Sequence, residues 1–183
     1  MSDIRKRLDE MKIRMQEDDF IAGRGLSNEV NIRIFCYDPK DEMVIRYFVE
    51  QLTKESLKYK VHIADLYDIC LSILEDKKAL KNIPKMEIKK GNQIIEKQII
   101  DICKASVCAK KIANNISDDE SLLLITGVGK VFPFMRAHSL LSGLQQEVNK
   151  PIILLYPGTF DGRYLRLFNK LKTSDYYRAF DMI

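Results

Sequence analysis

A glycine-containing turn at residues 126–130 has the residue types that could bind a phosphate. Its sequence reads Gly-Val-Gly-Lys from Gly127, and it lies between a predicted buried strand and a predicted helix. Backbone N–H groups in such a turn can cradle phosphate oxygens. A Walker loop would also need glycine where Leu124 stands and Ser or Thr where Val131 stands, and a dinucleotide fingerprint would need glycine in place of Phe132. A degenerate nucleotide-binding domain is therefore an alternative function, and the simpler interpretation is that the glycines permit a sharp turn.

The other reactive side chains do not form a recognisable catalytic set. His138 and Ser139 are adjacent, and neighbours on a helix are expected to point in different directions. Asp38, Asp65 and Asp161 each follow a predicted strand and could meet at one sheet edge to hold a metal. Turn and capping roles explain Asp38 and Asp161 equally well. We therefore predict a protein that is not an enzyme, with no catalytic residue, metal site or cofactor.

Aromatic and arginine residues gather in two loops, 127–133 and 157–163. Each loop follows a predicted buried strand, and a parallel sheet would bring both loops to the same end of the domain. Aromatic residues and arginine are the types that dominate binding energy at protein interfaces. The alternative is that the aromatic side chains only close the end of the core. The predicted partner-binding residues are Phe132, Arg136, Phe160, Asp161 and Arg163.

The positive charge of the chain is concentrated between residues 77 and 111. This segment contains ten lysines against three acidic residues, a net charge of +7, while the whole chain carries +4. On a helix predicted over 92–116, Lys97, Lys104 and Lys111 form a ridge with a spacing of seven residues. Such a ridge could contact nucleic acid or an acidic protein, or it could be a solvated helix face. Because no arginine or aromatic residue is interleaved with the lysines, any nucleic-acid binding should be weak and non-specific.

Composition is that of a globular protein from the cell interior. The chain has 183 residues, of which 46% are hydrophobic and 31% charged, which suits one domain over residues 1–183. No apolar stretch approaches the roughly 20 residues that span a membrane, and the N-terminal residues lack an apolar signal core. The four cysteines lie among apolar neighbours without a C-x-x-C pair. We expect buried, reduced thiols rather than a disulfide or zinc site, and a cytoplasmic location.

The elements that must position these residues alternate between helix and strand. Apolar spacing of three and four residues predicts the helices, and runs rich in β-branched and apolar residues predict the strands. Residues 82–91 read as a polar connection, and 164–168 with 176–183 as a hairpin or as a short helix followed by a strand. The predicted helices are 2–16, 39–57, 67–80, 92–116 and 133–144, and the predicted strands are 30–37, 59–66, 121–126 and 151–156.

This alternation predicts the α/β class. Strands separated by helices favour a mostly parallel sheet with helices on both faces, because each crossover helix must pack back on the sheet. We therefore expect a three-layer sandwich whose sheet is Rossmann-like or degenerate P-loop-like.

Four short segments resemble the BrxB family of BREX, a bacterial and archaeal bacteriophage-exclusion system. The resemblance extends from the first predicted helix to the last residues, although residues 76–98 carry no motif of the family. The four segments are FIAGRGLSNEV at 20–30, LITGVGKVFP at 124–133, PGTFDG at 157–162 and YYRAF at 176–180.

The resemblance implies a small cytoplasmic protein encoded beside a DNA methyltransferase, a large ATPase and the alkaline-phosphatase-like PglZ protein. The implied role is accessory: the protein supports phage restriction and methylation of self DNA as part of a complex, by contacting PglZ. No catalytic residues of the family carry over to this sequence. The residues and the resemblance together favour a non-catalytic interaction subunit whose partners are other BREX proteins. Its partner surface and stoichiometry stay open.

Overall fold

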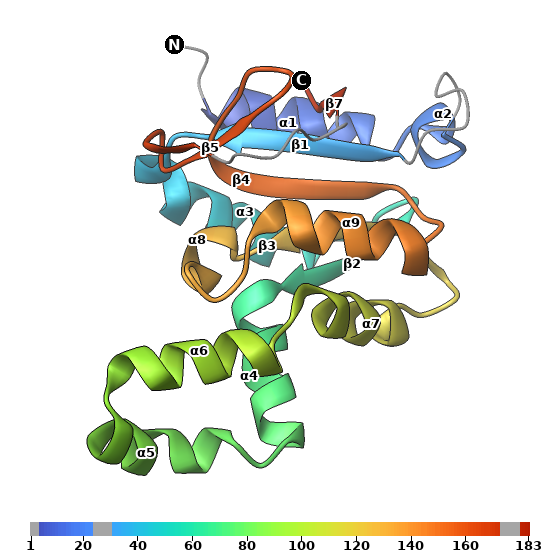
Figure 1. The fold of residues 1–183 in the computed structure, drawn as a ribbon. Helices are drawn as coiled ribbons and strands as arrows, with labels where there is room; N and C mark the ends of the chain where they lie inside the picture. Colours follow the sequence, from blue (N-terminus) through green and yellow to red (C-terminus); the bar gives the residue numbers. More distant parts are fainter. Residues whose placement is uncertain (1–3, 24–30, 173–179) are drawn as a thin grey trace.

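A parallel β-sheet forms the centre of the molecule. The computed structural model describes residues 4–23, 31–172 and 180–183, so Val30 of the first predicted strand and most of the YYRAF segment lie outside it. The strands follow the order β2-β3-β4-β1-β7, and each neighbouring pair is parallel (Figure 1). These strands are β1 (Ile32–Tyr37), β2 (Lys60–Asp65), β3 (Glu120–Thr126), β4 (Ile152–Phe160) and β7 (Phe180–Asp181).

Helices cover both faces of this sheet. Successive strand residues point to opposite faces, so Leu122 and Leu124 of β3 enter one core and Leu123 and Ile125 enter the other. On the first face lie α1 (Ile4–Arg14) and α3 (Glu42–Leu52), and on the second lie α4 (Leu66–Asp76), α7 (Ala105–Asn115) and α9 (Ala137–Glu147). The predicted three-layer α/β sandwich is confirmed. The short helix α2 (Asp18–Ile21) follows α1.

Two aspartates start helices directly after strands. Asp38 follows β1 and accepts a hydrogen bond of 3.1 Å from the Lys40 backbone N–H, and Pro39 opens the 3₁₀ turn η1 (Pro39–Asp41) before α3. Asp65 ends β2 and accepts a 2.9 Å bond from the Tyr67 N–H at the start of α4. A capping carboxylate satisfies an N–H group that the first helical turn leaves without a partner.

The prediction of one long helix over 92–116 is wrong. The chain forms α6 (Asn92–Ile102) and then α7, with a break at Cys103 and Lys104. The Lys104 carbonyl accepts the N–H groups of Val107 and Cys108 at 2.9 and 3.0 Å and so starts a new helix. Both helices contact α4, but α6 also packs on α5 and α7 packs on α9. Apolar residues keep helical spacing across the break, so the sequence pattern did not indicate that one helix ends and another begins there.

The interpretation of residues 82–91 as a polar connection is also wrong. They contain α5 (Ile83–Lys90), preceded by the 3₁₀ turn η2 (Leu80–Asn82). Pro84 lies in the first turn of α5, where its missing N–H removes no helical hydrogen bond. No residue of α5 is buried, which is why its sequence looks like that of a loop. Helices α5 and α6 form a hairpin that lies beside α4 and away from the sheet (Figure 1).

The chain after β3 departs from prediction at three points. Residues 128–131 form the short helix α8 (Val128–Val131), and the next helix, α9, begins at Ala137 rather than at Pro133. Strand β4 does not end at Tyr156 but continues through Pro157 and Gly158, where it pairs with β5 (Leu165–Leu167). Gly158 is required there because a Cβ atom would collide with the Arg166 carbonyl oxygen.

The last segment does not form the predicted hairpin. Strand β5 pairs antiparallel with β4 and with β6 (Leu171–Lys172), while β7 pairs parallel with β1 on the far side of the sheet. The predicted strand at 164–168 therefore exists as β5, but β7 is not its partner, and residues 176–179 lie outside the described residues. Pairing between distant strands is decided by the tertiary structure, and local sequence pattern carries little information about it.

Candidate functional site

The carboxyl ends of β3 and β4 lie next to each other, as the sequence predicts. The two strands pair in parallel with Leu123 opposite Ile152. The two predicted loop segments, 127–133 and 157–163, therefore lie at the same edge of the sheet, although β4 continues through Phe160 of the second segment. Ligands of open α/β sheets collect at this edge.

Close packing explains both glycines of the turn. Gly127 has φ of +80°, and a Cβ atom there would lie 2.5 Å from the Asp65 Oδ1 atom. A Cβ atom at Gly129 would lie 3.0 Å from the Phe168 ring. Any larger residue would displace the carboxylate or the ring, so the turn needs glycine at these positions without reference to a phosphate.

Lys130 forms an ion pair inside the protein. Its Nζ atom donates to Oδ2 of Asp65, while Oδ1 of the same carboxylate caps α4. The Lys130 side chain is 30% exposed and that of Asp65 is 17% exposed. The cation that would face a phosphate in a nucleotide-binding loop is thus neutralised by an aspartate, and α8, which contains Lys130, is a single turn.

The remaining carboxylates of this edge are used for turns. Asp38 caps η1, and Oδ1 of Asp161 accepts the N–H groups of Arg163 and Tyr164 at 3.0 and 2.7 Å. Within residues 4–23, 31–172 and 180–183, no three His, Cys, Asp or Glu side chains lie close enough together to hold a metal ion. The three strand-end aspartates are therefore separate.

His138 and Ser139 are closer than the sequence suggested. The Ser139 hydroxyl oxygen lies 3.0 Å from His138 Nε2 at the start of α9, so the expectation that the two side chains point apart is wrong. The two residues are the second and third of α9, in its first turn. The Ser139 side chain is exposed on the outer surface of α9.

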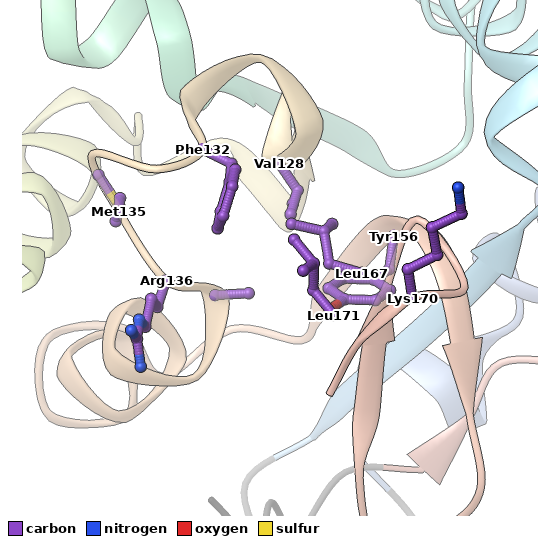
Figure 2. Close-up of a pocket in the computed structure, with 9 residues that line it drawn as sticks. Val128, Phe132, Met135, Arg136, Tyr156, Leu167, Lys170 and Leu171 are labelled. Atoms are coloured by element: carbon purple, nitrogen blue, oxygen red, sulfur yellow. The ribbon is translucent and has the colours of Figure 1, made fainter. Parts of the chain in front are cut away.

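A partly apolar pocket lies on the α9 side of the carboxyl edge (Figure 2). Its volume is about 320 Å³. The Phe132 ring, which stands edge-on to Phe168 with ring centres 6.3 Å apart, is 38% exposed, and Leu171 is 44% exposed. The apolar part of the lining consists mainly of Val128, Phe132, Met135, Tyr156, Leu167 and Leu171. We call this cavity the carboxyl-edge pocket.

The structure divides the five predicted partner-binding residues into two groups. Phe132 and Arg136 line the carboxyl-edge pocket. Asp161 and Arg163 belong instead to the turn between β4 and β5, and Phe160 is the last residue of β4, where it packs partly against the core.

Sequence reasoning missed the other side of the pocket, which β5, the turn after it and β6 supply through Leu167, Lys170 and Leu171. The sequence signal that could have found them is the PGTFDG turn followed directly by a predicted strand at 164–168. Such a turn indicates that the chain returns antiparallel to β4.

The three lysines predicted to bind nucleic acid do not form one straight ridge. Lys97 lies on α6 and Lys111 on α7, with Lys104 at the break between them. Lys104 pairs with Asp101 at 3.5 Å, and Lys111 pairs with Asp76 at 2.6 Å.

The cysteines are free thiols, as predicted. Cys70, Cys103 and Cys108 are buried where α4 meets the break before α7, and Cys36 on β1 is half-buried. The hydrogen bond with Cys70, together with burial, raises the pKa of the Cys103 thiol above its ordinary value. Burial raises the pKa of Cys36 to about 12. Such thiols stay protonated and are poor nucleophiles at neutral pH.

The architecture defines a class: an α/β sandwich with a parallel sheet and a surface pocket at the carboxyl edge. A family model described as BREX protein BrxB matches residues 62–182, and the chain belongs to this family. It is therefore a component of a BREX anti-phage defence system.

Relatives support this assignment over the full length. A BREX protein BrxB of Bacillus cereus is 38% identical across 100% of this chain and 99% of its own. A BREX protein BrxB of Escherichia coli is 27% identical across 97% and 90% of the two chains. No solved structure matches the chain. Among the described residues, no helix has the length and apolar character needed to cross a membrane.

Proposed function

We propose that the protein is a non-catalytic interaction subunit that acts in the cytoplasm and contacts the alkaline-phosphatase-like PglZ protein of its BREX system. Its work is to hold that partner within the complex that restricts phage and methylates self DNA. The carboxyl edge of the sheet is the surface that makes the contact.

One observation supports this role above the others: the polar groups of the carboxyl edge are bound to each other. Asp65 holds Lys130 and caps α4, and Asp161 holds its own turn. An enzyme of this fold would aim such groups at a substrate. Here the exposed part of the edge is apolar and cationic instead, with Phe132, Leu171 and Arg136 at the surface. Such a composition is typical of a protein interface.

The alternative function, a degenerate nucleotide-binding domain, uses the same turn at residues 126–130. The glycines of this turn are needed for packing, and its lysine is paired, so we expect no tight nucleotide binding. Calorimetric titration with Mg-ATP checks this. A dissociation constant below about 10 μM, roughly −7 kcal/mol, would make the nucleotide-binding role the better explanation.

The proposed contact is tested by charge reversal at the edge. We expect the double variant Arg136→Glu with Arg163→Glu to release PglZ in a pull-down from cells that carry the neighbouring genes, and to remove phage protection. Both side chains are exposed, so the melting temperature should be unchanged. The matched control is Lys6→Glu on α1, an exposed cation on the other face of the sheet, which should retain the partner.

Retention of PglZ by the well-folded double variant would place the contact elsewhere. The helical hairpin of α5 and α6, with its surplus of lysines, would then be the next surface to examine.

A further inference from the structure

We propose that the carboxyl-edge pocket binds one apolar side chain of an acidic segment of a partner protein. This inference rests on the proposed function as an interaction subunit and names the chemistry that the contact recognises. The occupant is an aromatic or large aliphatic side chain with carboxylates next to it in the partner sequence.

The pocket has the size and walls for such a side chain. Its volume of about 320 Å³ lies at the small end of ligand-binding cavities, which span about 300–1,000 Å³. Figure 2 shows Phe132 on one side of the space and Val128, Leu167 and Leu171 on the other. Tyr156, at 2% exposure, closes it from the sheet. Walls of this kind favour an apolar group and offer few hydrogen-bonding partners to a polar one.

Exposed apolar surface indicates that something covers the pocket. Phe132 and Leu171 face each other across the space with 38% and 44% of their surfaces exposed. The Phe132 ring also packs edge-on against the Phe168 ring. A side chain inserted between Phe132 and Leu171 would remove apolar surface from water on both walls at once. Clustered exposure of this kind, unlike single exposed residues, marks interaction sites.

The charges around the pocket select the occupant. Arg136 and Lys170 line it and are exposed, and neither forms an ion pair with any residue that the structure describes. Figure 2 shows the two side chains directed away from the apolar space on opposite sides of it. A single anion bound in the pocket would therefore not meet both cations. A chain segment with a carboxylate on each side of an apolar residue would meet both, which favours an acidic segment of a protein over a small free anion.

Two short peptides test the pocket without the partner protein. The isotope-labelled full-length protein is titrated with acetyl-Asp-Phe-Asp-amide and with acetyl-Lys-Phe-Lys-amide, and amide chemical shifts are followed by NMR. We expect the acidic peptide to bind at least about fivefold more tightly, in the millimolar range, and to shift signals from residues 128–137 and 165–171. Equal binding of the two peptides, no saturable shift, or shifts confined to other segments would overturn the proposal.

Substitution separates the pocket from the proposed partner. Leu171→Glu places a like charge at the mouth and should lower the affinity for the acidic peptide at least tenfold. Met43→Glu on α3, an apolar residue 70% exposed on the other face, is the control and should change nothing. If Leu171→Glu disturbs the short strand β6, the variant Arg136→Ala is used in its place. The expected result is then that the acidic and the basic peptide bind with equal affinity.

The peptide titration tests the pocket and the pull-down tests the named partner, so either proposal can be rejected while the other stands. A pull-down of PglZ that survives Leu171→Glu, with no peptide binding to the parent protein, rejects the pocket and leaves the interaction role standing. Charge-selective peptide binding without PglZ capture supports the pocket and rejects the named partner.

Discussion

At the scale of single residues, Asp65 connects the structural elements that meet at the carboxyl edge. Its two carboxylate oxygens cap α4 and hold Lys130, and Gly127 packs directly against it. A single side chain thus joins the end of β2, the start of α4 and the turn after β3. Residues that resemble a phosphate loop in sequence form a packing contact between these elements; we call it the Asp65 joint.

This joint makes Gly127 sensitive to substitution. We expect Gly127→Ala to lower the free energy of unfolding by about 2–3 kcal/mol, because alanine would adopt an unfavourable φ and its Cβ atom would displace the Asp65 carboxylate. Urea denaturation followed by circular dichroism measures the change. Gly162→Ala is the matched control, since Gly162 has a φ of +85° with no atom within 4 Å of the Cβ position, and it should cost about 1 kcal/mol. Equal losses for the two variants would show that contact with Asp65 contributes nothing.

At the scale of elements, the break between α6 and α7 changes the meaning of the lysine spacing. A spacing of seven residues aligns side chains only while one helix continues. Because the chain starts a new helix at Lys104, the lysines before and after the break belong to two separate helices, α6 and α7. Two of the three are also paired with aspartates on the surface.

Binding of nucleic acid by Lys97, Lys104 and Lys111 should accordingly be weak. We expect non-specific binding of duplex DNA at low salt, loss of that binding at about 150 mM salt, and little remaining when all three are changed to glutamate, because only phosphate contacts are available. Gel-shift assays over a salt series measure this. A shift that persists at physiological salt and distinguishes between DNA sequences would favour a nucleic-acid-binding subunit over an interaction subunit.

At the scale of the whole molecule, the strand order explains which helices share a face. The chain passes from β1 to β2 in one direction along the sheet and then returns through β3 and β4 in the other. Right-handed crossovers in opposite directions place their helices on opposite faces. Helix α3 therefore lies on one face, and α4, α7 and α9 on the other. The order differs from the 3-2-1-4-5-6 arrangement of dinucleotide-binding folds, although both are parallel sheets in three layers.

Stability should be distributed unevenly over this architecture. Strand β4 has β3 and β1 on its two sides and is buried over most of its length, whereas α5 contains no buried residue and packs on α6 and η2. We expect amides of residues 83–90 to exchange with deuterium at least about 100-fold faster than those of residues 152–156, because opening the hairpin exposes little apolar surface. Hydrogen-exchange mass spectrometry checks this. Equal protection of both segments would mean that the hairpin unfolds only together with the sheet.

The sequence by itself determined the class of fold, the first crossover and the position of the candidate surface. Apolar runs and β-branched residues marked the four long strands, and Asp38 with Pro39 marked a helix start that the structure confirms. The loops after β3 and β4 could be placed at one edge because parallel strands end together. These are local patterns joined by one topological rule.

The tertiary structure alone decided the contacts that give this surface its character. Asp65 pairs with Lys130, which lies 65 residues further along the chain. Strands β5 and β6 return beside β4 and supply Leu167, Lys170 and Leu171 to the pocket. The helix break at Cys103 was likewise visible only in the structure. Local propensity and periodicity describe how a segment can fold, but not which other segment will cover it. The pocket is built from two such segments, and only their packing against each other creates it.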